Sequence, residues 1–196
     1  MVLALAGILG PILFTAVFVI QELFRRDEYS PMAETVSALE AGPGGWVQQV
    51  NFVGFGLLTI AFAVGLHRGM RPTRAGVVGP AILVWTGVGL VLAAVFALRE
   101  DAAGATYDPT GLHSVNGAVF FLSIGVGLVV TSRRMAADPR WHSLATYALA
   151  TGIALLVMFV AFGVLVGLTM RRCTPGQASR SGWCWLSGSA ARSSLP

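Results

Sequence analysis

Three side chains of the kinds used in hydrolytic sites occur in the polar segments of this sequence: Ser37, Asp101 and His113. A serine can serve as a nucleophile when a histidine accepts its proton and a carboxylate orients the histidine. A histidine and a carboxylate can also bind a metal ion. We therefore take these three residues as candidate catalytic residues, and ask which elements would bring them together.

Three further polar residues, Glu22, Asn51 and Asn116, are expected at a similar depth in the molecule. One interpretation is a polar pocket that performs metal-dependent or hydrolytic chemistry. The other is a set of structural hydrogen bonds that tie loops to helix ends, because an ionisable group at membrane depth is costly unless it is paired, hydrated or functional. A zinc site normally supplies three or four protein ligands, and one histidine lies on this side. We therefore expect no metal and no other cofactor.

The elements that must position these residues are five apolar runs, each long enough to cross a membrane. A helix rises about 1.5 Å per residue and the hydrocarbon core is about 30 Å thick, so about 20 apolar residues span it. The sequence therefore predicts an all-α fold, a polytopic transmembrane helical bundle with five spans. The runs are Val2–Leu23, Trp46–Leu66, Ala75–Ala97, Leu112–Ser132 and Leu144–Leu168.

Composition agrees with a membrane protein. Hydrophobic residues make up 55% of the 196 residues and charged residues 11%, whereas a soluble domain carries roughly 25% charged residues. The net charge of +4 comes from arginines in the loops. These arginines form no continuous basic face, so we expect membrane lipids and not nucleic acid as partners.

The loop arginines also predict the orientation. Residues 67–74 carry three arginines and no acid, and the loop after the fourth run holds Arg133, Arg134 and Arg140 against Asp138. Both loops lie on one side of the membrane, and the positive-inside rule makes that side cytoplasmic. The N-terminus is then cytoplasmic too, in a multi-pass protein of the cell inner (plasma) membrane.

Paired glycines recur within three of the runs. They are Gly54 and Gly56, Gly87 and Gly89, and Gly125 and Gly127. Small residues let neighbouring helices approach closely, so we interpret these positions as packing faces.

The last 24 residues differ from the rest, which divides the chain into a bundle over residues 1–172 and an irregular tail over residues 173–196. The tail is rich in Ser, Gly and Arg, and interior glycines, a proline and arginines all oppose a spanning helix. The chain has no lysine, as expected from a GC-rich gene. Back-translating the tail with GC-rich codons in another frame gives an apolar, helix-like segment. Our hypothesis is that the tail is a frameshifted sixth helix.

Two segments, residues 29–58 and 95–121, carry a resemblance to a known family. The chain resembles the prokaryotic membrane proteins grouped as domain of unknown function 998, over Val2 to about Met170. The resemblance implies a six-helix bundle and no established activity. The motifs that carry it are Tyr29-Ser30-Pro31 with Ser37 and Leu39, Asn51-Phe52 with Gly56, Phe96 with Asp101, and Gly111-Leu112-His113.

Two classes of function remain open at this point. One is an integral membrane protein without catalysis, such as a small transporter, a lipid-binding protein or an accessory component. The other is a membrane-embedded hydrolase that acts on lipid at the outer leaflet through Ser37, Asp101 and His113. A water-accessible cavity where these three side chains converge favours the enzyme, and singly hydrogen-bonded groups in a dry bundle favour the first class.

Overall fold

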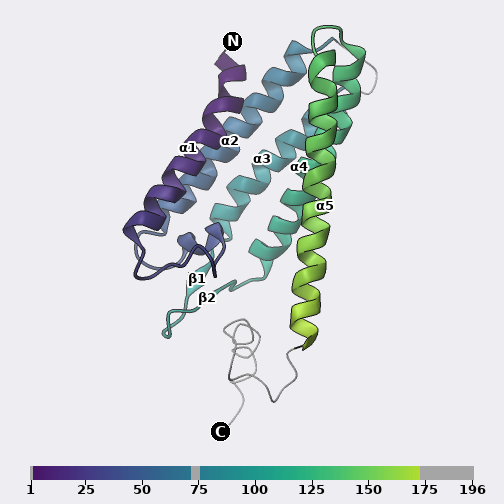
Figure 1. Cartoon of the computed structure of the whole chain (residues 1–196). Coiled ribbons are helices and arrows are strands. Elements are labelled where there is room, and N and C mark those ends of the chain that lie inside the picture. Colours follow the sequence, from purple (N-terminus) through teal and green to yellow (C-terminus); the bar gives the residue numbers. More distant parts are fainter. Residues whose placement is uncertain (1, 72–75, 173–196) are drawn as a thin grey trace. The chain divides into compact units, whose positions relative to one another are not determined.

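The computed structural model of the chain describes residues 2–71 and 76–172, and consists almost entirely of long helices (Figure 1). Two short strands and one short 3-10 helix lie in the connections between them. The elements in chain order are α1 (Val2–Phe24), η1 (Val36–Glu40), α2 (Trp46–Gly69), α3 (Val78–Val95), β1 (Arg99–Glu100), β2 (Thr106–Tyr107), α4 (Leu112–Ala137) and α5 (His142–Arg172).

In the described residues, five helices are long and apolar enough to cross a membrane, which confirms the predicted fold class. The shortest, α3, has 18 residues and is therefore about 27 Å long, close to the thickness of the hydrocarbon core. It begins at Val78, which places Pro80 in the first turn, where a missing backbone N–H breaks no helical hydrogen bond. Helix α4 extends beyond the predicted Ser132 to Ala137 and so includes two arginines that we had assigned to a loop.

The residues to Leu156 form one compact unit, in which α1 packs on α2, α2 on α3 and α3 on α4. Residues 157–172 continue α5 and are assigned to a second unit. The predicted tail, residues 173–196 with both cysteines, lies outside the described residues, and so does the frameshift hypothesis that rests on it.

Glycine permits the closest approach between α2 and α3. A Cβ atom on Gly56 would lie 2.6 Å from the carbonyl oxygen of Gly87, and one on Gly87 would lie 2.7 Å from the carbonyl oxygen of Gly56. Gly125 of α4 likewise faces Leu156 of α5 at 2.6 Å. These positions confirm the predicted role of glycine in helix packing. Gly54 is different, because nothing lies within 4 Å of its would-be Cβ.

Amide side chains join α1 to α2 within the apolar part of the bundle. The Gln21 Nε2 group donates to Gln48 Oε1 over 2.9 Å, and Asn51 Nδ2 donates to the same oxygen over 3.2 Å. Asn51 Nδ2 also donates to the Phe14 carbonyl over 3.0 Å. Polar groups in hydrocarbon need such partners, so this network fixes how the two helices face each other.

The end of the bundle with the basic loops is held by a buried arginine. Arg134, in the last turn of α4, is 7% exposed, and its guanidinium donates to the carbonyls of Met70, Arg71 and Gly76. The C-terminus of α2 leaves carbonyls without helical partners and carries a partial negative charge, and both features suit a cation. Asp138 is buried nearby and accepts hydrogen bonds from the Arg71 N–H and the Arg140 side chain, at 2.9 Å each. Arg134 thus binds the protein's own backbone, whereas the sequence predicted a loop arginine that sets orientation.

Candidate functional site: a pocket at the end of α3

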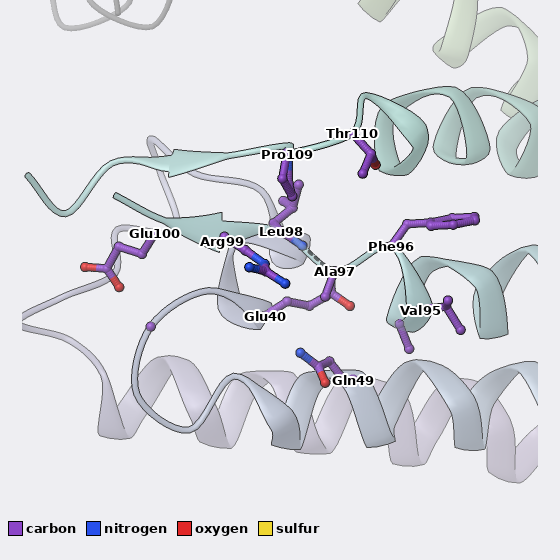
Figure 2. A pocket seen from close by; sticks show the side chains of 12 residues that line it. Glu40, Gln49, Val95, Phe96, Ala97, Leu98, Arg99, Glu100, Pro109 and Thr110 are labelled. Carbon is purple, nitrogen blue, oxygen red and sulfur yellow. Dashed lines mark hydrogen bonds between the residues drawn. The ribbon is translucent and has the colours of Figure 1, made fainter. Parts of the chain in front are cut away.

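A pocket of about 610 Å³ lies where α3 ends and the chain turns into β1 (Figure 2). One part of its lining is apolar and the other is polar or charged. The lining residues are Glu40, Gly42, Gln49, Ala94, Val95, Phe96, Ala97, Leu98, Arg99, Glu100, Pro109 and Thr110.

A tight turn between η1 and α2 forms one side of the pocket. Gly42 and Gly44 have φ values of +70° and +76°, a conformation that residues with a Cβ rarely adopt. A Cβ on Gly42 would lie 2.3 Å from Glu100 Oε2, so this glycine also lets the turn approach the hairpin. Glu40, just before this turn, and Gln49, in the first turn of α2 after it, both line the pocket.

A β-hairpin that the sequence analysis did not predict forms the other side. Strands β1 and β2 pair antiparallel, with Arg99 opposite Tyr107. The Asp101 Oδ1 atom accepts hydrogen bonds of 2.9 Å from the N–H groups of Ala103 and Ala105, and Gly104 has a φ of +79°. A side-chain acceptor and a glycine with positive φ are the usual means of reversing a chain this sharply.

The most deeply placed charged residue at this end is Glu40, which is 4% exposed. Its Oε2 atom lies 3.5 Å from the donating N–H of Leu98 and 3.4 Å from the Nδ1 atom of His113. Burial disfavours the carboxylate and raises the pKa of Glu40 to about 7, although the Leu98 N–H opposes this shift. Glu40 can therefore gain or lose a proton near neutral pH.

The three candidate catalytic residues make separate contacts. His113 is buried in the first turn of α4, and its Nδ1 atom lies 3.2 Å from the Phe96 carbonyl as well as near Glu40. Asp101 is exposed and its carboxylate holds the hairpin turn, while Ser37 is half-buried in η1. Within the described part of the chain, none of the three lines the pocket. The carboxylate that the fold brings to His113 is Glu40.

The predicted polar cluster is likewise divided among different helices. Glu22 forms a hydrogen bond with Tyr29, whose pKa is raised to about 12 by burial and by the charge of Glu22. Asn51 belongs to the amide network between α1 and α2. Asn116 Nδ2 donates to the Gly89 carbonyl over 2.8 Å and so joins α4 to α3. Each contact matches the structural interpretation, in which polar groups tie helices and loops together.

Among the described residues, no group of three His, Cys, Asp or Glu side chains is placed to hold a metal ion. The chemistry that this arrangement offers is binding. Arg99, Gln49 and Thr110 present a cation, an amide and a hydroxyl, and Ala94, Val95 and Ala97 present apolar surface beside them.

The sequence analysis missed Glu40, Gln49 and Arg99 as members of one site. A signal for Glu40 was present, because it is the one acid in the short segment Val36-Ser37-Ala38-Leu39-Glu40, which ends just before the turn Gly42-Pro43-Gly44-Gly45. No comparable local signal connects it to Arg99, since the two come from different loops.

Comparison with known proteins gives a family and no activity. Searches of curated proteins and of solved structures found no match. A family profile described as "Protein of unknown function (DUF998)" matches residues 8–189, which include all of α2, α3 and α4 and extend into the tail. The chain is a membrane protein that belongs to the DUF998 family.

Proposed function

We propose that this protein is a lipid-binding component of a prokaryotic plasma membrane, and that it holds an amphiphile in the pocket at the end of α3. The observation that carries the proposal is the two-sided lining of the pocket. Val95 is 66% exposed on the surface of a spanning helix, and Arg99 is exposed in the hairpin that follows. A molecule with an apolar tail and a polar head would contact both.

The position of the pocket supports the same proposal. It lies where α3 gives way to polar loops, and Trp46, at the start of α2 on the same end, is 66% exposed. Indole rings are enriched where hydrocarbon meets water, so this level corresponds to the lipid head groups. With a cytoplasmic N-terminus, as the loop arginines predict, the pocket faces the outer leaflet.

The test is whether a purified protein keeps a phospholipid because of this pocket. Native mass spectrometry of detergent-solubilised protein should detect a bound phospholipid. Ala97→Trp places an indole in the lining and should reduce the bound fraction. Ala102→Trp is the matched control, because Ala102 is exposed in the hairpin and is not a lining residue. Equal retention by all three proteins would contradict the proposal.

The alternative, a lipid hydrolase using Ser37, Asp101 and His113, requires these side chains to meet. Asp101 bonds to its own hairpin and His113 lies beside Glu40, so their contacts do not favour it. Hydrolysis of phospholipid by the purified protein that is lost in Ser37→Ala would restore the alternative.

A further inference from the structure

A buried carboxylate oxygen without a donor points to the chemistry of the ligand. Both contacts of Glu40, from Leu98 and His113, are made by Oε2, and Oε1 has no hydrogen-bond partner among the described residues. The side chain is fully buried. Buried acceptors are nearly always paired, because leaving one unpaired costs the free energy of its lost hydration. An acceptor of this kind at a pocket wall is suited to an N–H or O–H donor from a ligand.

A second group in the same pocket has charge to offer. Arg99 is exposed, and its side chain makes no hydrogen bond or ion pair within residues 2–71 and 76–172. In Figure 2 the Arg99 side chain points toward the same part of the pocket as those of Glu40 and Gln49. A guanidinium group suits phosphate oxygens, which it can bind through two parallel N–H groups. Because no hydrogen bond or ion pair among the described residues holds the Arg99 side chain, it is available to bind a ligand in the pocket.

We propose that the pocket binds a phospholipid whose head group carries both a phosphodiester and a primary ammonium group. This inference rests on the proposed lipid-binding function and names the class of lipid that is bound. Arg99 binds the phosphate, and Glu40 Oε1 accepts a hydrogen bond from the ammonium. The ligand is a lipid and not a soluble phosphate ester because Ala94 and Val95 extend the lining along the membrane-facing end of α3.

The unpaired oxygen distinguishes between zwitterionic head groups. A primary ammonium has N–H donors, and a quaternary ammonium has the same charge without them. An anionic lipid such as phosphatidylglycerol offers phosphate to Arg99 but no positive charge to Glu40. We therefore expect phosphatidylethanolamine to bind better than either phosphatidylcholine or phosphatidylglycerol.

The experiment compares these three lipids, with identical acyl chains, on delipidated full-length protein in detergent at pH 8. Native mass spectrometry should give about tenfold higher affinity for phosphatidylethanolamine, as expected for one hydrogen bond to a charged group. In Glu40→Gln the three affinities should become nearly equal. In Arg99→Gln all three should fall together. Glu28→Gln and Arg26→Gln are matched controls, because both residues are exposed at the same end and neither lines the pocket.

Acidification gives a measurement on the wild-type protein if Glu40→Gln does not fold. The titratable or charged groups around Glu40 are Arg25, which directly follows α1, Arg99 and Glu100 of β1, and His113 of α4. Helix α2 contributes the amide of Gln49 to the same pocket. Between pH 8 and pH 5.5 Glu40 gains a proton, because its pKa is about 7, and the neutral carboxyl group attracts an ammonium less strongly. The preference for phosphatidylethanolamine should therefore disappear.

The outcomes separate the inference from the function on which it rests. Equal affinity of the wild type for all three lipids at pH 8 overturns the head-group assignment and leaves lipid binding intact. Failure of every lipid to bind overturns lipid binding itself. Soluble phosphoethanolamine has the same head group without acyl chains. If it displaces bound phosphatidylethanolamine at concentrations as low as those of the lipid, the acyl chains contribute nothing to binding, and the choice of a lipid ligand is overturned.

Discussion

The Nδ1 atom of His113 lies 3.4 Å from the Oε2 atom of Glu40, and this contact joins the first turn of α4 to the connection between α1 and α2. Both side chains are buried, and Glu40 also meets the backbone where α3 passes into β1. Three separate stretches of chain therefore converge on one carboxyl group beside the pocket.

This carboxyl group should make stability depend on pH. Burial raises the pKa of Glu40 in the folded state from 4.5 to about 7. The contribution of Glu40 to the free energy of unfolding is therefore fully present below pH 4.5 and is lost as the pH rises through 7. A loss of about 1–2 kcal/mol would lower Tm by about 2–8 °C in a chain of this size. Thermal unfolding in detergent between pH 5 and 8 measures it. Glu40→Gln should remove this part of the pH dependence, and Glu28→Gln should keep it.

Substitution of Gly87 by alanine should force α3 away from its close contact with α2 and lower stability. The new Cβ would lie 2.7 Å from the Gly56 carbonyl oxygen and 2.6 Å from the Ile60 side chain. The carbonyl belongs to the backbone of α2, so it cannot move aside as the end of a flexible side chain could. We expect a loss of about 1–3 kcal/mol, measured by thermal unfolding in detergent. Gly54→Ala is the control on α2, because its Cβ meets nothing within 4 Å, and it should leave stability unchanged or raised. Equal stability of both variants would show that the helices do not pack through these glycines.

Arg134 and Arg133 are neighbours in sequence, but their substitution should affect stability to very different extents. Arg134→Met removes the donors to the carbonyls of Met70 and Arg71 and should cost about 2–5 kcal/mol, because hydrogen bonds to a charged group are strong and the carbonyls remain buried. Arg133 is exposed, so Arg133→Met should change stability by no more than about 0.5 kcal/mol. Unfolding in detergent compares the two, and a similar loss in both would contradict the capping role.

The orientation can be tested with two exposed alanines at opposite ends of the bundle. In a variant with Cys173→Ser and Cys184→Ser, a cysteine at Ala102 should react with a membrane-impermeant maleimide added to intact cells. A cysteine at Ala137 should react only after the cells are opened, because the arginine-rich loops are expected in the cytoplasm. The reverse pattern would place the pocket at the cytoplasmic face.

The helices could be predicted from sequence because membrane spanning is a property of a single continuous segment. The predicted start at Trp46 and the start at Leu112 match the structure. The differences lie at polar ends: α2 continues through His67 and Arg68, and α4 continues through Arg134. Helical backbone satisfies its own hydrogen bonds, so it does not stop where the apolar residues stop.

The site could not be predicted in the same way, because its members depend on which loops meet. The sequence analysis groups His113 with Asp101 and Ser37 as candidate catalytic residues. The hairpin turn instead uses Asp101 for its own backbone N–H groups. Glu40 reaches His113 through the fold of the loop between α1 and α2, and hydropathy gives no information about that approach.

Helices α2, α3 and α4 each pack on the helix that precedes them in the chain, and this order has a consequence for biosynthesis. A span that packs on its immediate predecessor can find its partner as soon as it leaves the ribosome and enters the bilayer, without waiting for later parts of the chain. The contact between Glu40 and His113 does not share this advantage, because His113 emerges long after Glu40. We therefore expect a nascent chain released after α3 to be inserted and largely packed, with Glu40 still lacking its imidazole neighbour.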